Sequence, residues 1–269
     1  MRSISILGAG WLGFALAEQL QSTGNSIRLS KQTQDDVNTL KAQGWEAAAF
    51  SLGQSLPDTL VSEIAIINIP PRRRTVDPVL FFRNVCLLCD ELMQKGTQRI
   101  LFISTTSVYG EQPGIIDHTS PTSPKTDSGK AHVNIEHHLL QHYPHQVSIL
   151  RLAGLVGGTR HPINSLAGKT NIAQPYQPVN LVHRKDVINT INAILDKDAW
   201  GETFLLCSTE HPTKQEYYTW AATQLSLKPP QFVETPIPEN PRQIDCQNTL
   251  SRLNVKLVYP SPFDMIPLT

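Results

Sequence analysis

The residues best suited to chemistry lie near the start of the chain, where three glycines recur at a fixed spacing. Gly8, Gly10 and Gly13 form the pattern G-x-G-x-x-G, with Trp11 and Leu12 between the last two glycines. The first glycine permits a tight turn, the second lets the backbone approach a pyrophosphate, and the third lets a helix pack closely on a strand. The helix that follows directs unpaired N–H groups at the phosphates. We therefore expect all five residues to bind a dinucleotide.

The end of the second expected strand bears on which dinucleotide is bound. Sites specific for NAD usually place Asp or Glu there, to accept hydrogen bonds from the ribose hydroxyls of the adenosine. Here the strand ends in Ser30 and Lys31, a hydroxyl and a cation that suit a 2′-phosphate. Asp35 and Asp36 follow, but they fall early in the next expected helix, where carboxylates complement the helix dipole. We predict that NADP(H) is favoured over NAD(H).

A run of prolines and arginines follows the fourth expected strand. Pro70 and Pro71 lead into three arginines that begin at Arg72. Ligands of open parallel sheets bind outside the carboxyl ends of the strands, so these cations are placed to meet cofactor phosphates or an anionic substrate. We expect Pro70 and Arg72 at the cofactor site, and a solvated turn is the alternative interpretation.

An alternation of strands and helices must position these residues. Continuously apolar runs such as IAIINI and ILFIS are typical of strands in a parallel sheet covered on both faces. Strands are expected at 3–7, 26–29, 46–50, 64–69, 99–104 and 147–152, and helices at 12–21, 33–43, 78–95 and 128–142. This pattern predicts an α/β fold with a doubly wound, Rossmann-like parallel sheet.

The pattern changes after Arg151. Glycines and Pro162 interrupt the chain before the strand-like runs PVNLVH and ETFLLC, the helix-like runs KDVINTINAIL and KQEYYTWAATQL, and a proline-rich stretch at 229–241. We expect a dinucleotide-binding region over 1–152 and a smaller substrate-binding lobe over 153–269, packed together as a single compact unit.

Composition excludes several classes of partner. The 269 residues include 23 Lys plus Arg and 23 Asp plus Glu, so the formal net charge is zero. Nucleic-acid binders and polybasic membrane-surface proteins need a positive field, and no apolar run is long enough to span a bilayer. We expect neither nucleic acid nor membrane as a partner.

Cysteine and histidine spacings give no sign of a metal centre. The four cysteines are too scattered for a disulfide framework, which indicates a reducing, cytoplasmic location. Cys86 and Cys89 form a C-x-x-C within an apolar helical run, where buried thiols are the expectation. His138 and His142 stand four apart on an expected helix, but no third ligand completes a set. No metal is expected.

Four motifs in sequence order resemble the extended short-chain dehydrogenase/reductases, also called the NAD-dependent epimerase/dehydratase family. They are GAGWLG, ILFISTTSVYG, LRLAGLVGGTR and VNLVHRKDV, and the resemblance covers nearly the whole chain. The family usually carries G-x-x-G-x-x-G, so the tighter spacing here points to an atypical subgroup. The resemblance implies an NAD(P)-dependent oxidoreductase, or an epimerase/dehydratase, acting on a small polar molecule or a nucleotide sugar.

The resemblance also implies catalytic residues. A Ser or Thr hydroxyl holds the substrate, and Thr105 occupies that position. A lysine binds the nicotinamide ribose, and Lys130 occupies that position, followed by Glu136, an acid common in the same helix. The family's tyrosine, four residues before the lysine, is replaced by Thr126. A threonine hydroxyl titrates far above a phenol and cannot take over the ionised role.

Three explanations for the missing tyrosine stay open. Tyr109 or Tyr176 supplies the acid, the reaction needs no such acid, or the protein binds NADP(H) without turnover as a sensor or scaffold. An interaction protein that keeps the fold for dimerisation is a weaker alternative, since relatives often form homodimers through helices flanking the sheet. Lys130 is then a ligand-binding residue or an ordinary surface lysine.

The second half of the chain supplies substrate contacts in the family that it resembles. Arg160 and His183 match positions that line the substrate cleft there. His183 is either a proton carrier or a buried structural histidine. Asp186 is expected to cap the helix that follows it.

Overall fold

The fold was derived from a computed structural model, which describes residues 1–71 and 77–267. Arg72 therefore lies outside the described residues. Strands β1 (Ser3–Leu7), β2 (Ser26–Lys31), β3 (Glu46–Ala49), β4 (Ile64–Ile67), β5 (Arg99–Thr105), β7 (Val147–Leu152) and β10 (Thr203–Leu206) form one sheet in the order β10-β7-β5-β4-β1-β2-β3. The strand pairs from β5 to β3 are all parallel. The predicted α/β fold is confirmed.

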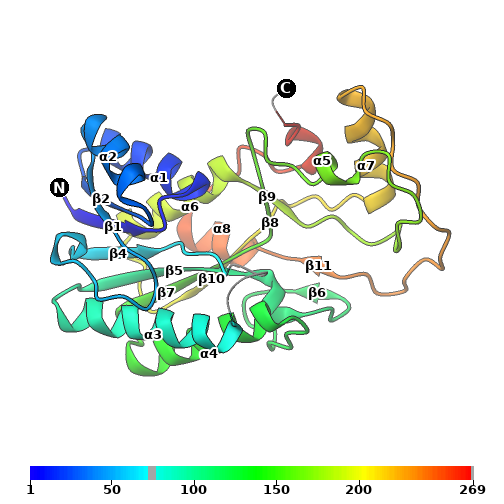
Figure 1. The fold of residues 1–269 in the computed structure, drawn as a ribbon. Coiled ribbons are helices and arrows are strands. Elements are labelled where there is room, and N and C mark those ends of the chain that lie inside the picture. The colour runs from blue at the N-terminus through cyan, green and yellow to red at the C-terminus, as the bar shows by residue number, and fades with distance from the viewer. Residues whose placement is uncertain (72–76, 268–269) are drawn as a thin grey trace. The chain divides into compact units, whose positions relative to one another are not determined.

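Helices cover the two faces of this sheet in the doubly wound manner. Helices α1 (Trp11–Ser22) and α2 (Gln34–Ala42) lie on one face, and α3 (Pro78–Gln94) and α4 (Asp127–His142) on the other (Figure 1). The order explains this arrangement, because right-handed crossovers cover opposite faces when strands are added in opposite directions from β1. The carboxyl ends of β1, β2, β4 and β5 therefore meet at one edge.

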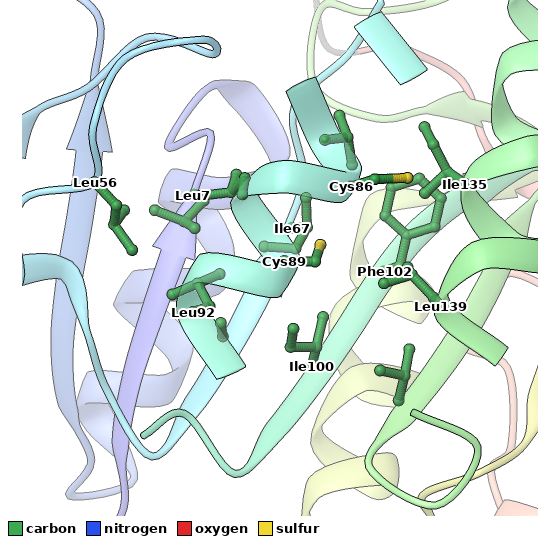
Figure 2. Packing of buried hydrophobic residues seen from close by; sticks show 14 of the residues in the cluster. Leu7, Leu56, Ile67, Cys86, Cys89, Leu92, Ile100, Phe102, Ile135 and Leu139 are labelled. Atoms are coloured by element: carbon green, nitrogen blue, oxygen red, sulfur yellow. The ribbon is translucent and has the colours of Figure 1, made fainter. Parts of the chain in front are cut away.

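The core beneath α3 and α4 is continuous and apolar. Figure 2 shows strand residues such as Ile67 and Phe102 pointing toward α3 and toward Leu139 of α4. Cys86 and Cys89 are free and buried in this cluster, as predicted. Burial raises the pKa of the Cys86 thiol to about 12, with Asp90 adding to the effect, so the thiol is unreactive near neutral pH.

Chain contacts divide the molecule into two compact units that do not coincide with the expected 1–152 and 153–269 regions. The first comprises Met1–Val108, Pro124–Leu150 and Ile194–Thr203, and the second Tyr109–Ser123, Arg151–Ala193 and Phe204–Thr269. One difference is the stretch Ile194–Thr203, up to the first residue of β10, which packs with the first unit although it lies in the expected second region. The other is the segment 109–123, which precedes α4 but packs with the later residues.

The second unit is built from short elements around its own core. Strand β6 (Ile115–Ile116) pairs with β11 (Gln243–Ile244), and β8 (Gly154–Val156) pairs with β9 (Leu181–His183). The helices are α5 (Ile163–Leu166), α6 (Arg184–Asp196), α7 (Lys214–Gln224) and α8 (Gln247–Leu253). Only the end of PVNLVH is a strand. Within residues 1–71 and 77–267, no helix combines the length and apolar character that crossing a bilayer requires.

Candidate functional site

Two of the three motif glycines are required by close packing. Gly8 follows β1 with a φ of +101°, and a Cβ there would collide with the carbonyl oxygen of Asn68, just after β4. A Cβ at Gly13 would lie 2.5 Å from the carbonyl oxygen of Gly8. The first glycine thus makes the turn out of the strand, and the third seats α1 against that turn.

Gly10 is different, because nothing in the protein lies within 4 Å of where its Cβ would be. The residue is exposed and precedes α1 with an extended backbone and no side-chain cap, and the first turn of the helix holds no acidic residue. Leu12 is 5% exposed and anchors that turn in the core, while Trp11 is half-buried. The space beside Gly10 at this helix start is therefore open, and the first turn brings no carboxylate to it, an arrangement that fits a diphosphate.

Ser30 does not stand out into solvent as expected for a phosphate ligand. Its side chain is 4% exposed, and its Oγ accepts a hydrogen bond of 2.9 Å from the Gly8 N–H. The reason is position, since Ser30 lies near the end of β2, directly beside the turn that leaves β1. Lys31, the next residue, is half-buried, and Pro70 is exposed.

Other charges near the end of β2 have partners elsewhere. Arg28 Nε pairs with Glu46 at 3.2 Å, and its Nη1 donates to the carbonyl oxygen of Val61. Asp36 Oδ2 accepts a hydrogen bond of 2.8 Å from the Thr33 hydroxyl, and Thr33 caps α2. Asp36 is therefore part of a helix start, as the sequence indicated.

Thr105 and the first turn of α4 are brought together within the first unit. Thr105 ends β5, and its hydroxyl accepts a hydrogen bond of 3.2 Å from the Ser107 N–H. A Cβ at Gly129, the residue before Lys130, would lie 2.8 Å from the carbonyl oxygen of Ser107. This contact holds the start of α4 against the turn that follows Thr105. Lys130 itself is exposed, and its Nζ lies 3.3 Å from Asp127, a surface pair of little energetic weight.

Thr126 caps α4 from the residue just before the helix. Its hydroxyl accepts a hydrogen bond of 3.0 Å from the Gly129 N–H. Further along the helix, the buried Ser104 hydroxyl donates to the Glu136 carboxylate at 2.5 Å, which ties α4 to β5 a second time. Thr126 therefore has a structural use that a tyrosine at the same position could not serve.

Neither Tyr109 nor Tyr176 has a phenol hydroxyl placed to replace the family's catalytic tyrosine. Tyr109 is fully buried, and its hydroxyl accepts a hydrogen bond of 2.7 Å from Arg151 Nη1. The Tyr176 hydroxyl donates to Glu234 at 3.0 Å, and this bond to a carboxylate raises the pKa of Tyr176. Both phenols are committed to contacts inside the second unit.

No family model matches the chain. The protein YeeZ of Escherichia coli K12 is 34% identical to it over 272 residues, covering 98% of this chain and 99% of YeeZ. The chain belongs to the YeeZ family.

Solved structures show which fold the YeeZ family has. A conserved protein of unknown function from Silicibacter pomeroyi DSS superposes with a TM-score of 0.79 at 23% identity, over 99% of this chain and 97% of the other. UDP-glucuronic acid 4-epimerase from Bacillus cereus, solved in complex with NAD, has a TM-score of 0.79 at 16% identity, over 98% and 96% of the two chains. The resemblance to extended short-chain dehydrogenase/reductases is thus confirmed for the fold.

In the second unit of this YeeZ-family chain, Arg160 and His183 differ in exposure. Arg160 is exposed and closes a tight turn, in which its backbone exchanges two hydrogen bonds of 3.0 Å with Gly157. His183 stacks on Tyr259 with ring centroids 3.7 Å apart, and its Nδ1 accepts from the Lys185 N–H. Burial, with help from Arg184, lowers the pKa of His183 to about 4. It is a packed neutral histidine, and a proton-carrier role near neutral pH does not fit.

Asp186 does not cap its own helix as expected. Its carboxylate accepts hydrogen bonds from the N–H groups of Val258 and Tyr259, at 2.7 and 3.1 Å. The side chain points away from α6 because the C-terminal segment passes beside it. Asp186 therefore holds that segment, and with it the ring on which His183 stacks.

His138 and His142 contact one another and α3, and they do not form a pair of metal ligands. Their rings stack with centroids 4.3 Å apart, and His138 Nε2 lies 2.9 Å from Asp90 Oδ1, which also accepts from the Tyr143 hydroxyl. In the part of the chain that the structure describes, no three His, Cys, Asp or Glu side chains gather as a metal site requires.

Two residues were not expected from the sequence as site residues. One contacts the glycine loop, and the other lies in the first turn of α4. Asn68 donates from Nδ2 to the Gly8 carbonyl at 3.0 Å, and Gly129 gives α4 its close approach to Ser107. The sequence signal for Asn68 is a polar residue directly after the apolar run IAII. Gly129 carries no comparable signal, since a glycine in the first turn of a helix is ordinary.

Proposed function

We propose that this protein is a nicotinamide-dinucleotide-binding oxidoreductase or epimerase that acts on a small polar molecule or a nucleotide sugar. The observation that carries the proposal is a difference in surroundings between the three glycines of the loop. Gly8 and Gly13 are needed by the protein's own packing, whereas the space beside Gly10 is left open. A diphosphate is the group for which such an opening at a helix start is suited.

The chain's own residues would share the work as follows. Residues Gly8 to Gly13 hold the diphosphate, and the Lys130 ammonium binds the ribose next to the nicotinamide. The Thr105 hydroxyl orients the substrate oxygen. When bound, the cofactor supplies the hydride acceptor or donor. One solved protein of similar fold is a UDP-glucuronic acid 4-epimerase, which supports a nucleotide sugar as the substrate class.

Cofactor preference rests on Lys31. With Ser30 turned into the loop, Lys31 is the cation of this turn available to a 2′-phosphate. No carboxylate occupies positions 30 to 33, and the Asp36 carboxylate already accepts a hydrogen bond from Thr33. We propose NADP(H) over NAD(H), although the epimerase of similar fold was solved with NAD.

Titration of the protein with NADPH and NADH tests both statements. We expect NADPH to bind more tightly, and Lys31→Ala to weaken NADPH about tenfold or more while changing NADH binding less than about threefold. Lys41→Ala, in the last turn of α2, is the matched control. Tighter binding of NADH would overturn the preference, and no binding of either would overturn the function.

A catalytically silent NADP(H)-binding sensor is the second candidate. The use of Thr126 as a helix cap favours it, together with the absence of an available phenol at Tyr109 or Tyr176. The two candidates differ in whether an added nucleotide sugar is converted to a product.

Lys130→Met separates the two candidates. For an enzyme, we expect turnover to fall at least about 100-fold, because the variant loses the cation that orients the ribose. Lys125→Met, at an exposed lysine five residues earlier, should keep full activity. Wild-type protein that binds NADPH but turns over no nucleotide sugar would favour the sensor, and a fully active Lys130→Met variant would refute the role of the lysine.

A further inference from the structure

The backbone of Gly8 is held by a side chain on each side. Its N–H donates to Ser30 Oγ at 2.9 Å, and its carbonyl accepts from Asn68 Nδ2 at 3.0 Å. The two side chains come from opposite neighbours, since β1 lies between β2 and β4 in the sheet. Ser30 lies in β2 and Asn68 directly follows β4, so the sheet fixes the position of both partners.

We call the Ser30 and Asn68 side chains that hold Gly8 the clamp. Further contacts connect the clamp to Ala9, Gly10 and Gly13. The Ala9 N–H donates to the backbone carbonyl of Ser30 at 3.2 Å, and the Gly10 N–H donates to the Gly8 carbonyl at 2.8 Å. A Cβ at Gly13 would lie 3.1 Å from Asn68 Nδ2, so the amide also closes the space beneath α1. The orientation of the peptide before Gly10 therefore depends on Ser30 and Asn68.

We propose that Ser30 and Asn68 are positioning residues for the dinucleotide. They fix the two peptide groups of Gly8, so that the N–H groups at the start of α1 are already aimed at the diphosphate before it binds. The inference rests on the proposed function and assigns Ser30 a role other than contact with a 2′-phosphate. Preorganised donors bind an anion more tightly because no ordering of the loop is required at the moment of binding.

The clamp and Lys31 predict different patterns of cofactor binding. NADPH and NADH share the diphosphate, so loss of the clamp should weaken both cofactors by the same factor. Lys31 faces only the 2′-phosphate, so its loss should change their ratio. A constant ratio is therefore the signature of the positioning role.

The experiment compares Ser30→Thr with Ser30→Val, which have the same shape and differ in the hydroxyl. We expect the Thr variant to bind both cofactors within about threefold of wild type, and the Val variant to bind both about tenfold more weakly. Asn68→Ala, which cannot overpack the site, should show the same loss. Ser5→Ala is the control, because Ser5 is buried on β1 and its hydroxyl makes no hydrogen bond within the described residues.

Hydrogen exchange without cofactor supplies an independent readout. Amides of residues 8–13 should exchange faster in Ser30→Val and Asn68→Ala, while peptides from α3 and β5 stay unchanged. Equal binding and equal exchange in Ser30→Thr and Ser30→Val would overturn the inference and leave the proposed function standing. Wild-type protein that binds neither cofactor would overturn both.

Discussion

Gly10→Val should weaken binding of the dinucleotide at least about 100-fold, equivalent to about 2.7 kcal/mol of binding free energy, while the protein remains folded. The reason is that a Cβ at this position has no protein neighbour within 4 Å, and the valine side chain would occupy the space proposed for the diphosphate. The backbone of Gly10, with φ −84° and ψ −153°, is open to other residues. Valine is a poorer helix N-cap than glycine, so we expect the free energy of unfolding to fall by no more than about 1 kcal/mol.

Gly13→Ala provides the contrast to Gly10→Val. Its added methyl would meet the Gly8 carbonyl at 2.5 Å, so we expect a loss of about 1–3 kcal/mol in the free energy of unfolding as well as weaker binding. Isothermal titration and urea unfolding of the two variants measure both effects. A Gly10→Val variant that binds NADPH as wild type does would refute the assignment of the loop.

Acidification from pH 7 to pH 5 should lower the free energy of unfolding by about 2 kcal/mol through His161 alone. This histidine is 6% exposed, and burial lowers its pKa from 6.5 to about 4. The unfolded chain then takes up a proton as the pH falls below about 6.5, whereas the folded protein does so only near pH 4. The contribution is complete above pH 6.5 and is lost progressively between 6.5 and 4.

The surroundings of His161 explain why it stays neutral. Its Nδ1 accepts a hydrogen bond of 3.1 Å from the Ile163 N–H, and its Nε2 lies 2.7 Å from the hydroxyl of the fully buried Tyr217. With Nδ1 used as an acceptor, Nε2 carries the proton and donates to Tyr217. A second proton would have to displace the Ile163 N–H in an apolar core.

His161→Asn tests the effect, since the asparagine carbonyl can still accept from the Ile163 N–H. We expect urea unfolding of wild type to show about 2 kcal/mol more loss between pH 7 and pH 5 than the variant does. Other groups, among them His183 with its similarly lowered pKa, contribute equally to both proteins and cancel. The same pH dependence in both proteins would contradict the assignment.

Local pattern was sufficient to predict strands of the first unit and the position of its glycine loop. The strands β1 and β7 fall at the residues expected, because apolar runs of five or six residues bounded by polar ones have few other uses in a parallel sheet. The glycine motif was also placed correctly where a strand leads into a helix, with Gly8 and Gly10 between β1 and α1 and Gly13 in the first turn of α1. In each case the physical requirement is met by residues adjacent in the sequence.

Contacts between distant residues were not predictable in the same way. Ser30 and Asn68 are separated by 38 positions, and only the order of β2, β1 and β4 brings both to Gly8. Asp186 reaches a segment more than 70 residues later, so its expected role as a cap was wrong. The place of β10 in the sheet depends on which edge is vacant, a property of the assembled strands rather than of ETFLLC.

The cap at Thr126 limits how a tyrosine could be introduced at this position of the chain. Threonine is short enough for its hydroxyl to accept from the Gly129 N–H, and a tyrosine hydroxyl, at the far side of a ring, is not. A single Thr126→Tyr substitution would therefore uncap α4 at the turn that carries Lys130, at a cost of about 1 kcal/mol. A tyrosine at this position would need at least a second change that caps the helix from another residue.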